Sequence, residues 1–179
     1  MITMLVKRQQ KPEPKTARLF PSFPVVIASM EHNGERNLIT LGLVHVFSFN
    51  PFVLGIGISP ERHSYSLIDK SGEFVVNIPT RPLHNQIMIC GTKSGRDTDK
   101  FAATGFTAVK GTAVNAPIIK ECPVNFECRV IKKIEVGDHA WFMGTVLNVH
   151  IDSDYRREDA VEYWAGQFNL MGETIGKKL

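Results

Sequence analysis

Apolar and polar residues alternate along a long stretch of the chain, residues 123–136. Val124, Phe126 and Cys128 are separated there by polar residues. A period of two is the pattern of a strand with one buried face. Gly137-Asp138 then supplies a turn, and residues 139–151 form a second long apolar run. The pattern predicts a long strand, a turn and another long apolar segment.

A hairpin is predicted nearer the start of the chain, between residues 24–30 and 36–42. The two apolar segments flank Asn33-Gly34, a pair that readily adopts the positive φ angles of tight hairpin turns. Residues 52–59 and 73–79 are apolar runs of strand length. We expect a third strand and a later returning strand at these two positions.

Short helices are predicted between the strands. Residues 64–71 carry apolar positions at helical spacing and are followed by Gly72, a common residue at a helix end. Residues 83–90 and 99–105 are further short candidates, while the tail from Asp159 has a helical or irregular pattern. Strands interrupted by short helices, without regular alternation, predict a mainly β fold, a small barrel or sandwich.

The length of 179 residues fits one domain with a single core. Residues 7–15 are polar and contain two prolines, which is typical of a flexible segment. We therefore expect a flexible lead-in over residues 1–19 and one domain over residues 20–179, tail included.

Composition narrows the class of protein. Hydrophobic residues make up 43% and charged residues 22%, as in folded globular proteins. A formal net charge of +3 from scattered basic residues does not indicate nucleic-acid binding. An odd number of cysteines, three, argues against a secreted disulfide framework. No apolar stretch reaches the roughly 20 residues that span a bilayer, so we expect a cytoplasmic protein that does not contact a membrane.

Familiar catalytic motifs are missing from the sequence. There is no HExxH and no CxxC, so we expect no zinc site. Residues 55–61 begin like a dinucleotide fingerprint, but Pro60 replaces its third glycine and no long helix is predicted after it. Buried apolar packing is the favoured interpretation of Cys90, Cys122 and Cys128.

Two stretches have the composition of anion-binding segments. Residues 59–64 (SPERHS) contain Arg62, His63 and Ser64 at a predicted helix start, where free backbone amides attract anions. Residues 90–101 (CGTKSGRDTDKF) add Ser94 and Lys100 beside two glycines. The alternative for the first stretch is an N-cap with solvated charges, and for the second a solvated loop.

Residues 37–52 place polar side chains in an otherwise apolar segment. Asn37 and Thr40 stand near its start, and Ser48 lies before the bend at Asn50-Pro51. A flat ring with a polar edge needs apolar faces and a few hydrogen-bonding groups. An ordinary hairpin strand with exposed polar residues is the equally good alternative.

Six segments in this order resemble the flavin reductase-like family of FMN-binding split β-barrels, flavoredoxin type. They span about residues 20–147. The resemblance implies a split barrel and a homodimer with FMN at or near the subunit interface. The segments are NLITLG, VFSFNPF, ISPERHSYSLIDKSGEFVVNIP, CGTKSGRDTDKF, CPVNFEC and VGDHAWFMGTV.

The resemblance also implies roles for residues of a cofactor site. Asn37 and Thr40 correspond to residues against the isoalloxazine ring, and His139 to one near the flavin. Trp164 or Phe168 corresponds to a C-terminal aromatic residue on the ring, whereas Leu43 replaces a tryptophan of many relatives. Those that correspond to residues holding the 5′-phosphate are Arg62, Ser64, Ser94 and Lys100.

These observations predict an FMN-binding oxidoreductase or electron-transfer protein, in which the flavin supplies the redox chemistry. Its electron donor is either NAD(P)H or a redox protein. One alternative is an NAD(P)H-dependent flavin reductase in the strict sense. The other, from a different class, is a module that binds or stores flavin without redox chemistry.

Overall fold

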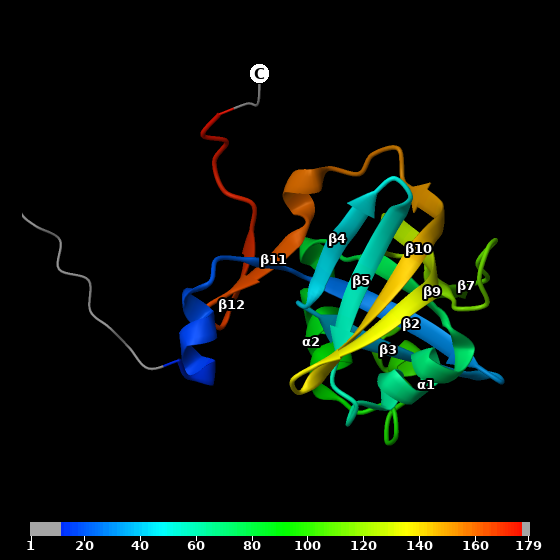
Figure 1. Ribbon diagram of the computed structural model, residues 1–179. Coiled ribbons are helices and arrows are strands. Elements are labelled where there is room, and N and C mark those ends of the chain that lie inside the picture. Colours follow the sequence, from blue (N-terminus) through cyan, green and yellow to red (C-terminus); the bar gives the residue numbers. More distant parts are fainter. Residues whose placement is uncertain (1–11, 177–179) are drawn as a thin grey trace, which may run out of the picture.

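The computed structural model describes residues 12–176, and a seven-stranded antiparallel sheet forms its centre (Figure 1). The strand order is β3-β2-β6-β9-β10-β5-β4. The sheet curls into a split barrel, so the predicted fold class is confirmed. Its strands are β2 (Val26–His32), β3 (Glu35–Leu41), β4 (Val44–Phe49), β5 (Phe52–Ile58), β6 (Glu73–Ile78), β9 (Val124–Val136) and β10 (His139–Ile151).

Both predicted turns join the expected strands. β2 pairs with β3 up to His32 opposite Glu35, and Asn33 and Gly34 between them have φ angles of 53° and 84°. β9 pairs with β10 through Gly137, whose φ is 61°. Local turn chemistry therefore identified these hairpins correctly.

One strand of the sheet, β4, was not predicted. Residues 37–52 are not one segment, because β3 ends at Leu41 and β4 begins at Val44. Val44 and Val46 face the core while Phe47 and Phe49 face outward. Apolar residues on both faces hide the alternation of a strand.

The three predicted helices are present and are short. α1 (His63–Ser71) ends at Gly72 with φ 68°, and Ser64 lies inside its first turn rather than at the N-cap. α2 (His84–Thr92) is followed by α3 (Lys100–Thr104), which is capped by the Asp99 carboxylate. Minor elements are β7 (Ala108–Val109), β8 (Ile118–Ile119) and 3-10 helices at Pro14–Leu19, Arg81–Leu83 and Arg157–Asp159.

Two hydrophobic clusters position these elements. Inside the barrel, Phe74 and Phe142 pack with residues of α1. Outside it, Leu38 of β3 packs against Ile87 of α2 and Phe101 of α3. β3 is therefore held between the barrel interior and the α2–α3 layer. All three cysteines are buried and free, as expected of small apolar core residues.

The two ends of the described chain form a second small sheet. β1 (Phe23–Pro24) pairs with β11 (Val161–Trp164), which pairs with β12 (Gln167–Leu170). Figure 1 shows this sheet at one side of the barrel. The helical or irregular pattern predicted for the tail is therefore wrong, because Ala165 and Gly166 with positive φ make a tight hairpin turn.

The predicted lead-in is only partly described. Residues 1–11 lie outside the described part, and Pro14–Leu19 form a 3-10 helix within the segment expected to be flexible. Within residues 12–176, no helix has the length and apolar character needed to cross a bilayer.

Candidate functional site

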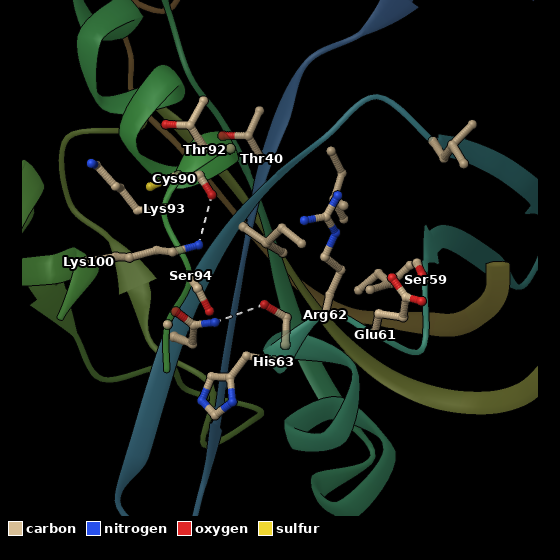
Figure 2. A pocket seen from close by; sticks show the side chains of 18 of the residues that line it. Thr40, Ser59, Glu61, Arg62, His63, Cys90, Thr92, Lys93, Ser94 and Lys100 are labelled. Atoms are coloured by element: carbon tan, nitrogen blue, oxygen red, sulfur yellow. Dashed lines mark hydrogen bonds between the residues drawn. The ribbon is translucent and has the colours of Figure 1, made fainter. Parts of the chain in front are cut away.

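A cavity of about 400 Å³ lies where the two edges of the curled sheet meet. β3 leads into β4 through Gly42 and Leu43, and the Leu43 carbonyl accepts a hydrogen bond from the Gly57 N–H of β5 (2.8 Å). The start of α1, the end of α2 and the α2–α3 loop complete the walls (Figure 2). Predicted site residues that line it are Asn37, Thr40, Leu43, Arg62, His63, Ser64, Ser94, Lys100 and His139.

Three predicted site residues do not line this cavity. Ser48 pairs with Val53 at the other end of the β4–β5 hairpin. Phe168 packs edge-on against His84 and lies in the small sheet, as does Trp164, which is 48% exposed. The tail hairpin carries both aromatic residues away from the cavity of their own chain.

Two cations of the α2–α3 loop, Lys93 and Arg96, were not among the predicted site residues and lie exposed at the rim. The glycines Gly91 of α2 and Gly95 of the loop, which the sequence already indicated, also line the cavity. These residues all belong to the stretch 90–101 that was singled out as an anion-binding segment. The sequence therefore located the segment and two of its lining residues, Ser94 and Lys100, but not Lys93 and Arg96 as site residues.

Asn37 and Thr40 face opposite sides of β3, as residues three apart in a strand must. The buried Asn37 side chain donates from Nδ2 to Ser64 Oγ in α1 (2.9 Å). Thr40 Oγ1 donates to the Ile87 carbonyl of α2 (2.7 Å). Each polar side chain thus ties β3 to a different helix.

Lys100 is a buried cation beside the cavity, only 4% exposed. Its Nζ donates to the carbonyl oxygens of Leu38 (2.7 Å) and Cys90 (2.8 Å), and Figure 2 shows the second bond. Burial lowers the pKa of Lys100; the Cys90 thiol opposes that change and Arg62 adds to it. An ammonium has three N–H donors, and no carboxylate among residues 12–176 forms an ion pair with this one.

A buried charge without a counter-ion is unfavourable, so this site fits an anionic group. Figure 2 shows Lys100 and Arg62 on opposite sides of the view, with Lys93 near the Cys90 end. Arg96 donates to the Glu61 carbonyl (3.1 Å), which holds the α2–α3 loop against the start of α1. Cations of three segments thus surround one cavity.

The two histidines of the site have carboxylate partners. His63 Nε2 lies 2.7 Å from Glu35 Oε1, and His139 Nδ1 lies 2.7 Å from Asp138 Oδ1. Burial raises the pKa of the Cys90 thiol to about 11, so it stays protonated at neutral pH. Neither the histidine–carboxylate pairs nor the protonated thiol is the arrangement of a nucleophile with its general base.

Part of the cavity lining is aliphatic. Ile39, Leu41, Leu43 and Ile58 provide apolar surface, and no Phe, Tyr or Trp of the described chain lines the cavity. No group of three or more metal-ligating side chains occurs in residues 12–176. The site combines several cations, hydroxyls, one acidic residue (Glu61) and aliphatic surface, and the excess of cations suits a ligand with an anionic end and an apolar body.

Comparisons with known proteins agree with this architecture. An uncharacterized protein of Archaeoglobus fulgidus is 42% identical over 115 residues, covering 64% of this chain and 65% of that relative. That match spans just under two thirds of the relative. The chain is 27% identical to an NADH:riboflavin 5′-phosphate oxidoreductase of Streptomyces pristinaespiralis, covering 69% of this chain and 68% of the relative.

A solved structure covers almost the whole fold. The flavoredoxin of Methanosarcina acetivorans matches with a TM-score of 0.86 and 26% identity, over 97% of this chain and 96% of that one. The family model of the flavin reductase like domain matches residues 17–171. The chain therefore belongs to the flavin reductase like domain family.

Proposed function

We propose that the protein is an FMN-binding oxidoreductase or electron-transfer protein. The observation that carries this is the buried Lys100 ammonium, which lies beside a cavity with aliphatic surface and forms no ion pair with a carboxylate of residues 12–176. FMN matches both parts, because it has an anionic phosphate and a large flat ring. The names of the relatives from Streptomyces pristinaespiralis and Methanosarcina acetivorans support the same conclusion.

The residues present fit FMN with the phosphate at the cationic end. Ser64 Oγ accepts from Asn37 and Ser94 Oγ accepts from the Arg96 N–H, so each hydroxyl keeps its own hydrogen to donate. Arg62 and Lys100 supply positive charge. These four residues would hold the phosphate, as the resemblance implies.

The ring would lie on the aliphatic surface of the cavity. Ile39 and Leu41 of β3, with Leu43 and Ile58, would exclude water from one face of it. His139, in contact with Asp138, lies at the cavity wall and would alter the electrostatic potential at the ring. When bound, FMN supplies hydride and single-electron transfer, which the side chains of this site do not.

The electron donor is either NAD(P)H or a redox protein. An NAD(P)H-dependent flavin reductase is the second candidate function, favoured by the name of the Streptomyces relative. A protein donor is favoured by the likeness to a flavoredoxin. We further propose a cytoplasmic location, where three free cysteines stay reduced.

We also propose a homodimer with the site close to the subunit interface. The outward face of β4, β5 and β10 is apolar: Phe47 lies over Gly55 and packs edge-on against Trp141, with ring centroids 5.5 Å apart. Two further exposed apolar side chains lie on these strands, Phe49 of β4 (88% exposed) and Leu147 of β10 (42% exposed). Such a face favours burial against a second copy, which would also cover the mouth beside Leu43.

The test is a pair of flavin titrations followed by anaerobic reduction. We expect the protein to be yellow or to take up FMN more tightly than riboflavin; a colourless protein that binds neither flavin contradicts the proposal. Bleaching by NADH or NADPH supports the reductase, and bleaching only by a reduced redox protein supports electron transfer. A bound flavin that neither donor reduces supports a storage module.

Sedimentation tests the dimer. The wild-type protein should sediment as a dimer, and Phe49→Asp should shift it toward monomer, whereas Phe20→Asp at the exposed chain start should not. A monomer that keeps full FMN affinity at high dilution contradicts the shared interface.

A further inference from the structure

We propose that Asn37 is a positioning residue that fixes the gap between the two anion-binding segments of the cavity. These segments are the start of α1, with Arg62 and Ser64, and the loop at residues 94–96. In this role Asn37 controls how tightly the phosphate end is held, without being a ligand of the ring. The inference rests on the proposed function, because phosphate binding is the property that it explains.

The first contact joins Asn37 to α1. Asn37 is 3% exposed and Ser64 is 1% exposed, so their hydrogen bond of 2.9 Å is shielded from water. Because the amide donates, the Ser64 oxygen is oriented as an acceptor toward β3. The Ser64 hydrogen is then directed elsewhere, which prepares this hydroxyl to donate to an anion.

The second contact joins Asn37 to the loop. A methyl group added at Gly95 would lie 2.5 Å from Cγ and 2.6 Å from Nδ2 of Asn37, and closer still to Oδ1. Nearly equal distances to all three atoms mean that the glycine packs on the flat face of the carboxamide. Rotation of the amide about its own axis would not relieve that overlap. Gly95 therefore rests directly on Asn37.

One buried amide thus contacts three segments that are far apart in the sequence. Its nitrogen holds α1 through Ser64, its face supports the loop through Gly95, and its backbone belongs to β3. The resemblance places Asn37 against the isoalloxazine ring, whereas these contacts direct it to the two segments on either side of the phosphate end. A change in its volume should therefore alter the spacing of Arg62 and Ser94.

The experiment substitutes each side of the Asn37–Gly95 contact. Gly95→Ala should weaken FMN binding about tenfold or more, because a displaced loop loses a charged hydrogen bond. Riboflavin binding should change less than about threefold, since riboflavin has no phosphate. Gly172→Ala is the control, because Gly172 does not line the cavity and a methyl there would meet no heavy atom within 4 Å among the described residues. Neither glycine has a positive φ that would strain an alanine.

The double variant sharpens the test. Asn37→Ala removes the atoms that the new methyl group would overlap, so Asn37→Ala with Gly95→Ala should bind FMN more tightly than the two single losses predict. The melting temperature of each flavin-free variant separates a positioning role from general destabilisation. If Gly95→Ala does not fold, Asn37→Ala alone should lower the preference for FMN over riboflavin.

Three outcomes would overturn the inference. Equal losses for FMN and riboflavin would show that Asn37 acts on the ring or on overall stability. Strictly additive losses in the double variant would show that the Asn37–Gly95 contact does not set the gap. A wild-type protein that binds neither flavin would remove the proposed function and this inference with it.

Discussion

Glu127 and Lys100 are the two charged side chains that the structure buries, among those described, and their surroundings are opposite. Glu127 is covered by the loop at residues 111–115 and is surrounded by donors. Lys100 is covered by α2 and β3 beside the cavity and has two carbonyl partners. Glu127 therefore stabilises the fold, whereas Lys100 keeps the capacity to bind a ligand.

Glu127 is a fully paired carboxylate. Its oxygens accept from the backbone N–H groups of Thr112, Ala113 and Val114, and His150 Nε2 lies 2.7 Å away. Burial alone would raise the pKa of Glu127, but the hydrogen bonds from His150, Ala113 and Thr112 outweigh it and lower the pKa to about 2. The ionised form is therefore the stable one, and its role is to anchor the loop.

Lys100 shows the reverse balance. Burial lowers its pKa, and the two carbonyls that it contacts carry only partial charge, including one at the C-terminal end of α2. Its charged form is therefore less favoured than in water. Both groups are buried, but only Lys100 would gain from a counter-ion, which is why we propose the cavity beside it as the binding site.

The largest expected effect is on stability at the paired carboxylate. Glu127→Gln should lower the free energy of unfolding by about 3–5 kcal/mol, because an amide nitrogen would face N–H donors that now bind a carboxylate. Chemical denaturation of the flavin-free protein measures it. Glu121→Gln is the control, since the exposed Glu121 carboxylate accepts from the Thr107 N–H alone within the described part of the chain. A loss below 1 kcal/mol for Glu127→Gln would contradict the anchoring role.

Acid should remove the same stabilisation from the wild type. The pKa of Glu127 is lower in the folded chain than its ordinary value of 4.5, so its contribution is complete above that pH and is lost as the pH falls toward about 2. The decrease should be about 3 kcal/mol. Unfolding measured across this window should show a shallower dependence in Glu127→Gln, and parallel curves for the two proteins would contradict the prediction.

Removing the charge of Lys100 should act on binding rather than on the fold. Lys100→Met should weaken FMN binding by a factor of about 10 to 100, because one charged hydrogen bond is lost, and should hardly change riboflavin binding. Fluorescence titration with both flavins gives the two affinities. Lys70→Met, at an exposed lysine of α1, is the control. Equal losses for both flavins would mean that Lys100 only braces α2 against β3.

The smallest effect is expected at His150, one of the hydrogen-bond partners of Glu127. His150→Ala removes one donor while the three backbone N–H groups remain, so unfolding should become easier by about 1 kcal/mol. FMN affinity should stay unchanged. A loss as large as that of Glu127→Gln would show that the histidine, not the loop backbone, carries the pairing.

Short-range features of the fold were predicted from the sequence because neighbouring residues cause them. Asn33-Gly34 and Gly137 adopt the positive φ angles that turn the two hairpins, and Gly72 ends α1. Residues 90–101 were singled out by their glycines, hydroxyls and cations, and several of these residues line the cavity. These signals need no knowledge of the rest of the chain.

Partners that are distant in sequence were decided only by the tertiary structure. Strand β4 and the β11–β12 hairpin were not predicted. Apolar residues on both faces of a strand leave no clear apolar–polar alternation in the sequence. The same limit applied to Lys100, which the family resemblance marked as a phosphate ligand. Only packing showed that two of its N–H groups already bind Leu38 and Cys90.

The candidate site shows most clearly which features the sequence determines and which the tertiary structure decides. The sequence by itself determined that Asn37, Ser64 and the loop with Gly95 are polar or small positions. That they meet in one buried contact depends on how far β3 runs and on how α1 and the α2–α3 loop pack at its end. Composition therefore specifies which chemistry is available, and the packing of distant segments specifies which groups are used up in the fold and which remain for a ligand.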